Sequence, residues 1–437
     1  MKRVIFLCSL IGWISCQQNT EYQRLAENPE FLHSALSKLT DIIVYDIFSP
    51  PVASRNYAYP SIAAYEAIQQ AHPENASFAG RLHELTETPA PPQEEEVHFG
   101  IAAFHAFAVV GKALIFSENR MDEFMQTTQQ EYRDMGVPRK VLRSSLSYGE
   151  TVAQHILDWA DKDNYKQTRT FPKFEIRDDP GRWQPTPPDY MEGIEPSWRE
   201  MRTFVIDSAQ QFTPPFPTEY DMDERSVFYE EVIEVYEVVN NLNDERTEIA
   251  KFWDCNPYVS HHKGHVMFAT KKITPGGHWM GIAQIAAKKD SADFMKTAKT
   301  LALTSIALYD AFVSCWDEKY RSNLIRPETV INQHIDEDWL PLLQTPPFPE
   351  YTSGHSVISS AAAITLTAIY GDDFAFDDTV EVAYGLPMRS FTSFLDASSE
   401  AAVSRLYGGI HFMPAIENGV TQGQHLGRLI TERLGLN

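Results

Sequence analysis

Apolar residues recur every three or four positions along most of the chain, and this pattern limits the folds that are open to it. Three long runs of this kind lie at residues 225–252, 291–325 and 355–370. Such spacing gathers the apolar side chains on one face of a helix. Alternating polar and apolar residues between turn signals, which would indicate strands, are scarce. The sequence therefore predicts an all-α protein built from helical bundles.

Proline-rich stretches separate the helical runs. They occupy residues 86–96, 171–217 and 341–349, and they predict loops. The middle stretch is long, which is typical of a binding loop within a compact domain.

Two heptapeptides resemble each other, SIAAYEA at residues 61–67 and SIALYDA at residues 305–311. The repeat suggests two related bundles of the four-helix type, joined through long proline-rich loops. We place the N-terminal bundle at residues 17–220 and the C-terminal bundle at residues 221–437.

The 437 residues include 37 Lys and Arg against 60 Asp and Glu, which gives a net charge of −23. So acidic a chain does not supply the positive field that nucleic-acid binding needs, and it disfavours docking on anionic lipid. The 43% hydrophobic content is enough for a sizeable core, which argues against disorder. We expect a monomer or a small homo-oligomer that binds no nucleic acid.

The first sixteen residues have the features of a secretory signal. Two basic residues precede an apolar stretch at residues 4–14 that is too short to span a bilayer. Ser15 then precedes Cys16, which resembles the lipobox of bacterial lipoproteins. We expect residues 1–16 to direct export to the periplasm or the cell surface, with a lipid anchor at Cys16. Ordinary signal cleavage nearby is the alternative.

Two cysteines lie beyond this signal, Cys255 and Cys315. They are too few for a disulfide framework, and neither belongs to a CxxC pair, which excludes a zinc finger. We expect both to be buried thiols. The histidines His261, His262 and His265 include a pair at i, i+4 spacing without the glutamate of an HExxH motif, so we interpret them as a structural or rim cluster.

Three short segments of the C-terminal half concentrate groups that can hold a tetrahedral oxyanion. The first contains Lys319 and Arg326, which are seven residues or two helical turns apart and should project from nearly one helix face. Pro327 should end that helix at Arg326 and place the guanidinium at its terminus. Alone, such a pair would be an ordinary solvated helix face.

The second and third segments add a helix start and two histidines. Ser353 is expected to cap a helix whose free N–H groups attract anions, and Gly354 lets the backbone approach a ligand closely. His355 would then exchange protons with the bound anion. Arg405 offers a planar fork of donors, and His411 follows two glycines. Together the three segments predict one oxyanion site.

The segments read K-x6-RP, SGH and SR-x5-H in order along residues 319–411. This order resembles the three-part signature of the superfamily of type 2 phosphatidic acid phosphatases and vanadium-dependent haloperoxidases. Residues 48–55, 183–188 and 262–265 are also similar to exported haloperoxidase-like proteins of the bacteroidetal and flavobacterial iodoperoxidase-like branch.

For a haloperoxidase, the resemblance implies a vanadate cofactor that acts as a Lewis acid on hydrogen peroxide, so that a halide is oxidised to hypohalous acid. It implies that His411 is the single protein ligand to vanadium and that His355 is the acid–base group. Lys319 would also activate the peroxide. The residues implied to hold the vanadate oxygens are Lys319, Arg326, Ser353, Gly354 and Arg405.

For a phosphatase, the resemblance implies instead that His411 attacks phosphorus. The phosphatase signature has Asp at the position of Ala415, and Thr352 stands where Pro is usual. The chain also lacks the spanning helices of the membrane phosphatases and is much longer than the soluble ones. We therefore favour a haloperoxidase. An exported acid phosphatase is the alternative, and an inactive lipoprotein that binds an anion or a partner is the second alternative.

The halide is implied by the residues around the signature. Phe348 resembles the fungal chloroperoxidase at a position where algal bromoperoxidases have His. Bacterial members of the branch are often specific for iodide, the most easily oxidised of these halides, so the resemblance implies iodide, with bromide as a further substrate. Trp316 and Asp317 are expected to support the site, Asp317 by orienting a cationic group. Tyr258 and Trp316 would line its entrance.

Overall fold

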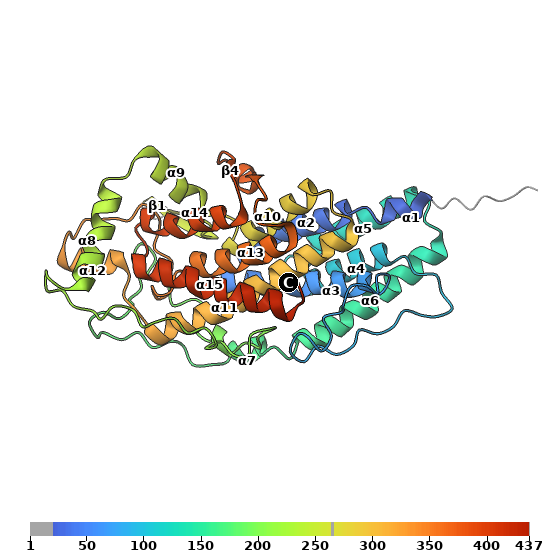
Figure 1. Cartoon of the computed structure of the whole chain (residues 1–437), viewed down its shortest axis with the longest axis horizontal. Helices are drawn as coiled ribbons and strands as arrows, with labels where there is room; N and C mark the ends of the chain where they lie inside the picture. The colour runs from blue at the N-terminus through green and yellow to red at the C-terminus, as the bar shows by residue number, and fades with distance from the viewer. Residues whose placement is uncertain (1–20, 264–265, 437) are drawn as a thin grey trace, which may run out of the picture.

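The computed structural model describes residues 21–263 and 266–436 of the chain. Within them the protein is mainly helical with long loops, as the sequence predicted, and the strands form two short antiparallel pairs (Figure 1). The predicted signal at residues 1–16 lies outside the described residues, so export and the anchor at Cys16 stay predictions. None of the described helices is long and apolar enough to cross a membrane.

The bounds of the elements are as follows. The α-helices are α1 (Glu21–Ala26), α2 (Glu30–Asp46), α3 (Pro50–Gln69), α4 (Phe99–Ala113), α5 (Glu118–Asp134), α6 (Arg139–Ala160), α7 (Tyr165–Thr168), α8 (Val227–Asn240), α9 (Asp244–Phe252), α10 (Pro275–Lys289), α11 (Phe294–Ser322), α12 (Pro327–His334), α13 (Gly354–Tyr370), α14 (Phe394–Tyr407) and α15 (Met413–Arg433). Two short 3-10 helices are η1 (Trp198–Glu200) and η2 (Val380–Tyr384), and the strands are β1 (Tyr258–Lys263), β2 (Val266–Lys271), β3 (Phe376–Asp378) and β4 (Arg389–Phe391).

The proline-rich stretches are loops, as predicted. Residues 86–96 lie between α3 and α4, residues 341–349 lie between α12 and α13, and the long stretch at residues 171–217 contains η1 alone among the described elements. The run at residues 225–252 differs from its prediction, because it is split into α8 and α9. Asn243 starts the second helix by accepting a hydrogen bond from the N–H of Arg246.

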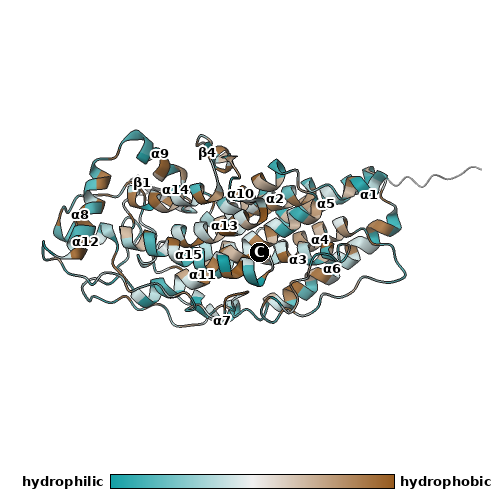
Figure 2. Cartoon of the chain, viewed as in Figure 1, coloured by the Kyte–Doolittle hydropathy of each residue, from teal (hydrophilic) through white to brown (hydrophobic). Residues whose placement is uncertain are grey.

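Two long helices, α3 and α11, pack against each other at the centre of the molecule (Figure 1). Every residue of α3 from Pro50 to Ile68 is buried, and so is most of α11. Outer helices such as α8 carry both hydrophilic and hydrophobic residues along their length, so that one face of each joins the core (Figure 2). The largest core cluster contains residues on both sides of position 220. The division at that position into two bundles stays a prediction.

The two similar heptapeptides lie on α3 and α11, and their tyrosines play matching parts. The Tyr65 hydroxyl donates to the carbonyl of Ala76 at 2.8 Å, and the Tyr309 hydroxyl donates to the carbonyl of Arg202 at 3.0 Å. Each central helix thus holds a loop that passes beside it.

The acidic residue after each tyrosine makes the same attachment stronger. Glu66 accepts from the N–H of Phe78 at 2.7 Å, and Asp310 accepts from the N–H groups of residues 204–206 at 2.7 to 3.0 Å. Both carboxylates are fully buried. Hydrogen bonds to a charged acceptor are stronger than neutral ones, so these two residues fix the loops to the core.

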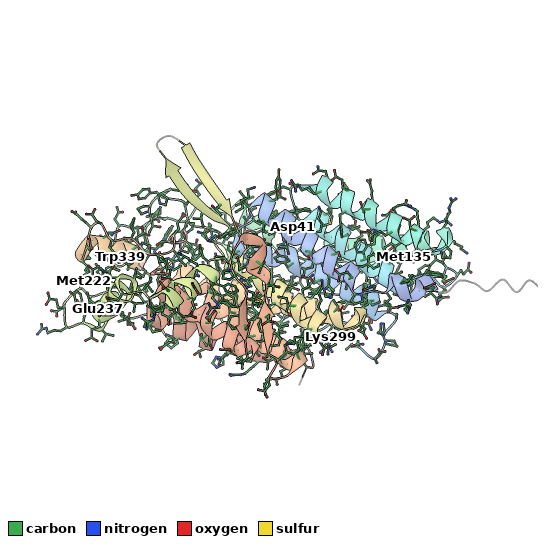
Figure 3. All side chains as sticks on the ribbon, turned by 90° about the horizontal axis from the view of Figure 1, so that it is seen from above. Asp41, Met135, Met222, Glu237, Lys299 and Trp339 are labelled. Carbon is green, nitrogen blue, oxygen red and sulfur yellow. The ribbon has the colours of Figure 1, made fainter. Side chains whose placement is uncertain are left out.

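The strands β1 and β2 form a hairpin that projects from the body of the molecule (Figure 3). His261 and His262 belong to β1, whereas residue 265 lies outside the described residues. His261 and His262 are therefore not part of a helix, and the interpretation of the three histidines as a structural or rim cluster stays a prediction.

Asp310→Ala would leave three buried N–H groups without their acceptor. Because each such group costs about 1–3 kcal/mol, we expect the free energy of unfolding to fall by about 3 kcal/mol or more. Denaturation in urea measures this loss. The exposed Asp372 supplies a matched control, since Asp372→Ala should change stability by no more than about 0.5 kcal/mol. Equal midpoints for the two variants would show that other contacts hold the loop.

Candidate active site

A cavity of about 530 Å³ lies at the N-terminal end of α13. Its volume is that of a small-molecule site. The long proline-rich loop contributes Met191 and Ile194 to the wall, in agreement with its interpretation as a binding loop. Four residues of the predicted oxyanion site also form the wall: Gly354, His355, Arg405 and His411.

The first predicted segment is arranged differently from the expectation. The helix α11 ends at Ser322, because Asn323 adopts a left-handed φ of 49° and its N–H bonds to the carbonyl of Lys319. Arg326 is therefore not on the same helix as Lys319. It lies in extended conformation just before α12, so the prediction of one shared helix face is wrong. The guanidinium does lie at a helix terminus, but at the start of α12 and not at the end of α11.

The Lys319 ammonium is fully buried and joins α11 to the segment before α13. It donates to the carbonyls of Pro349, Glu350 and Thr352 at 3.1, 3.0 and 2.5 Å. These three bonds use its three protons. In this arrangement Lys319 could act on an anion through its positive charge and not through a further hydrogen bond.

Arg326 is also fully buried and lies against His411. Its Nε donates to the carbonyl of Phe348 at 2.8 Å, and its Nη1 donates to the carbonyl of Ile410 at 2.7 Å. The same Nη1 lies 3.2 Å from Nε2 of His411. The other terminal nitrogen, Nη2, has no partner among the described residues.

The second segment starts α13 as predicted. The Ser353 hydroxyl caps the helix by accepting from the N–H of Ser356 at 3.3 Å, and Gly354 is the first helical residue. The N–H of Ser353 bonds to the carbonyl of Ala415 at 3.0 Å. This bond ties the start of α13 to the start of α15, and two residues of the first turn of α13, Gly354 and His355, line the cavity.

A backbone carbonyl that the sequence did not reveal positions His355 and Arg405. Nη1 of Arg405 donates to the carbonyl of Trp253 at 2.7 Å, and the His355 ring bonds to the same carbonyl. Nε of Arg405 and Nε2 of His355 have no partner among the described residues. Because both side chains line the cavity, these nitrogens are free for a ligand.

His411 is held by a buried carboxylate that sequence reasoning missed. Nδ1 of His411 lies 2.8 Å from Oε1 of Glu350, which also accepts from the N–H of Phe412 at 3.0 Å. A carboxylate on Nδ1 keeps the ring proton there and leaves the lone pair on Nε2. His411 is thus prepared to bind a metal or to act as a nucleophile through Nε2. Glu350 comes three residues before Ser353 in the sequence. A lone carboxylate so close to the predicted cationic site was the signal that could have identified it.

Three basic groups lie around His411, and one carboxyl, that of Glu350, bonds to its ring. Burial lowers the pKa of Lys319 to about 8, that of Arg326 to about 10, and that of Arg405 below its usual value. Burial also raises the pKa of Glu350 to about 7, against the pull of Arg326 and Lys319. Each basic group would gain from a nearby anion, because an anion offsets the cost of keeping its charge away from water.

Both histidines are neutral in this surrounding. The pKa of His355 lies well below its usual value because of burial and the charge of Arg405. The pKa of His411 is also well below its usual value, because of burial and the charges of Arg326 and Lys319. A neutral imidazole can bind a metal or accept a proton, whereas an imidazolium can do neither.

Two aromatic residues predicted near the site line the cavity. The rings of Trp316 and Phe348 lie 5.0 Å apart. The Phe348 ring lies 5.0 Å from Nζ of Lys319 and 5.0 Å from Cζ of Arg326, so it faces both cations.

The other two predicted residues are not brought to the cavity in the same way. The Asp317 carboxylate accepts from the Gln210 side chain at 2.7 Å and lies 3.8 Å from Nε of Arg321. Two positions before Lys319 on a helix, it points to the far side of α11. That Asp317 orients a cationic group stays a prediction. Tyr258 is the first residue of β1, and its place at the entrance stays a prediction.

These groups fit an oxyanion such as phosphate or vanadate. Three cations, a helix start and the unpaired nitrogens of Arg326, Arg405 and His355 surround Nε2 of His411. Such donors match the oxygens of a tetrahedral anion. A Cβ at Gly354 would meet Trp316 at 3.7 Å, so the glycine widens the space for such an anion without being needed to avoid a clash.

Comparisons with known proteins agree with this site. A family model described as the VCPO second helical-bundle domain matches residues 299–435. The crystal structure of a bacterial vanadium-dependent iodoperoxidase is similar, with 53% identity and a TM-score of 0.89, covering 93% of this chain and 97% of that chain. A search of curated proteins gave no match.

Two further structures show the same fold. A holo-type bacterial vanadium-dependent chloroperoxidase is 18% identical, with a TM-score of 0.68 and coverage of 89% of this chain and 93% of that chain. The apo-type structure is also 18% identical, with a TM-score of 0.69 and coverage of 89% and 95%. The helical fold and the oxyanion site define the class of the protein, a haloperoxidase whose oxyanion site resembles that of phosphatases. With 53% identity to the iodoperoxidase over nearly its whole length, this chain belongs to the vanadium-dependent haloperoxidases.

Glu350→Ala should weaken vanadate binding by about 10–100-fold, because His411 would lose the partner that fixes its tautomer. Glu350→Gln keeps an acceptor for the proton on Nδ1 of His411 and should lose less vanadate affinity. The dissociation constant of orthovanadate, measured by calorimetry without halide, checks this order. If Glu350→Ala bound vanadate as tightly as the wild type, Glu350 would not position His411.

The affinity for vanadate should also follow the protonation of Lys319. With a pKa of about 8 in the free site, Lys319 is charged below that pH and neutral above it. A bound anion favours the charged form, so affinity should fall by up to about tenfold per unit as pH rises above about 8.

Lys319→Met is the matched control, because it removes this titration and leaves that of vanadate itself. The ratio of wild-type to variant affinity should be large at pH 6 and should decline above pH 8. A ratio that stays constant from pH 6 to pH 10 would contradict a titrating Lys319 at the anion.

Proposed function

We propose that this protein oxidises halide ions with hydrogen peroxide by means of bound vanadate, and that iodide is its preferred halide. The observation that carries the proposal is His411, whose Nε2 lies among buried cations while Glu350 holds Nδ1. The net reaction takes up one proton as hydrogen peroxide and a halide ion become hypohalous acid and water.

The residues around the cavity have separate tasks. When bound, vanadate supplies a Lewis acid that makes hydrogen peroxide open to attack by a halide. His411 would hold the metal through Nε2. The groups that would hold the vanadate oxygens are the unpaired nitrogens of Arg326 and Arg405, the Ser353 hydroxyl and the Gly354 N–H, with Lys319 adding its charge. This array is fixed before any ligand arrives, so it stabilises charge without rearrangement.

His355 is suited to move the proton. Its ring is neutral, it is fixed by the Trp253 carbonyl, and its Nε2 has no partner among the described residues. It can therefore accept a proton from hydrogen peroxide at neutral pH and return it to the departing oxygen.

The preference for iodide is supported by the cavity wall and by a relative. The wall contains Phe312, Trp316 and Phe348 and is largely apolar. Iodide is larger than bromide and chloride and is the most weakly hydrated of the three. It therefore loses the least hydration free energy when it leaves water for an apolar wall. A 53% identical protein is an iodoperoxidase. Bromide is a further expected substrate.

A phosphatase reaction is a second candidate, because Glu350 supplies support that the sequence did not show. With Ala415 in place of the Asp of the phosphatase signature, a nucleophilic histidine would lack a carboxylate from that position. Glu350, from the segment before α13, provides a carboxylate to Nδ1 of His411. His411 is therefore also prepared to attack phosphorus when vanadate is not bound.

Reconstitution with vanadate tests the proposal. The metal-free protein, with and without orthovanadate, is assayed for triiodide formation from iodide and peroxide and for hydrolysis of p-nitrophenyl phosphate. We expect iodide oxidation only in the sample that contains orthovanadate, and at a higher rate than the oxidation of bromide or chloride.

His411→Ala should lose bound vanadium and at least about 10³-fold of kcat/KM, because it removes the protein ligand. The exposed His425 supplies the control, and His425→Ala should keep its bound vanadium and its kcat/KM. Phosphate-ester hydrolysis without vanadate, together with no halide oxidation in its presence, would make the protein a phosphatase instead.

A further inference from the structure

A second group of metal-ligand side chains lies beside the cavity. It consists of Cys255, His278 and Glu381, which come from the loop after α9, from α10 and from η2. Each is at most 1% exposed. Residue spacing gave no hint of the group, because its members lie 23 and 126 positions from Cys255.

The three ligand atoms have the separations of a tetrahedral site. Sγ of Cys255 lies 3.4 Å from Nδ1 of His278 and 3.9 Å from Oε1 of Glu381, and the last two atoms are 3.2 Å apart. Tetrahedral zinc with usual bond lengths would separate these pairs by about 3.6, about 3.5 and about 3.3 Å. Small side-chain movements would therefore suffice to bind the ion.

A fourth residue orients the histidine. Oδ2 of Asp378 lies 2.7 Å from Nε2 of His278 and is fully buried. A carboxylate on the far nitrogen of a histidine is the usual support of a metal ligand, because it leaves the lone pair on the nitrogen that binds the metal.

The charges of the group favour a cation between the three ligands. Two buried carboxylates, Asp378 and Glu381, lie 2.7 and 3.2 Å from the two ring nitrogens of His278. Two carboxylates and a thiol around one imidazole favour a divalent cation at this place, because a buried charge needs a partner of opposite sign.

We propose that Cys255, His278 and Glu381 bind a zinc ion, with Asp378 orienting His278 and with the fourth position open to water. A thiolate and an imidazole favour zinc over magnesium or calcium. Cys255 also lines the cavity, but the three ligands include none of the groups that would hold the oxyanion, and they would bind a cation instead of an anion.

Such an ion would support the neighbouring active site. Cys255 lies two residues after Trp253, and the Trp253 ring stacks on His278 with centroids 4.6 Å apart. The Trp253 carbonyl holds both His355 and Arg405. The zinc ion would therefore join three chain segments and fix the acceptor that positions these two side chains.

Metal analysis of the full-length protein tests the proposal. The protein is treated with a chelator, titrated with Co²⁺ and then with Zn²⁺, and zinc retained after gel filtration is measured by mass spectrometry. We expect one equivalent of metal, the visible absorption of tetrahedral cobalt, a thiolate-to-cobalt band in the near ultraviolet, and loss of both signals when zinc is added. No such band and no retained zinc in the wild-type protein would overturn the proposal without any variant.

Variants then assign the ligands. Cys255→Ser should lose the thiolate band, whereas Cys315→Ser, which changes the other buried thiol, should keep it. Asp378→Asn should weaken zinc binding by about 10–100-fold while the thiolate band remains. A thiolate band that survives in folded Cys255→Ser protein would show that the metal binds elsewhere.

Discussion

The site depends on positive charge that is buried but not neutralised. Lys319, Arg326 and Arg405 each direct hydrogen bonds to backbone carbonyls, so dipoles offset part of their desolvation. Carboxylate partners in the same places would have cancelled the charge and left little attraction for an anion. Glu350, a carboxyl that does reach this group, bonds to His411, and burial raises its pKa. The excess charge therefore remains available to an oxyanion.

This constraint explains why the cavity lies where helices end. Carbonyls within a helix are already bonded to N–H groups four residues further on, so free acceptors come from loops and helix termini. The acceptors used here are at residue 253, after α9, at residues 348–352, before α13, and at residue 410, between α14 and α15. The central pair α3 and α11 provides the rigid support on which these loops meet.

What the sequence could predict was local. Helical periodicity gave the helices, and motif spacing gave the groups that gather around the cavity. The expected common helix of Lys319 and Arg326 was wrong because Asn323 ends α11, and an asparagine in that position is itself a stop signal. The role of the Trp253 carbonyl could not be predicted from the sequence, because every residue has a backbone carbonyl. Glu350 was visible as a residue, but its partner lies 61 positions away.

The origin of the carboxylate on His411 also changes how the site is coupled. A carboxylate at position 415 would join His411 to its own segment. Glu350 instead comes from the segment that leads into α13, and it bonds to His411 and to the N–H of Phe412. The Ala415 carbonyl in turn accepts from the N–H of Ser353. The helix start and His411 are therefore held in one network, so that a shift in either changes the geometry that both present to an anion.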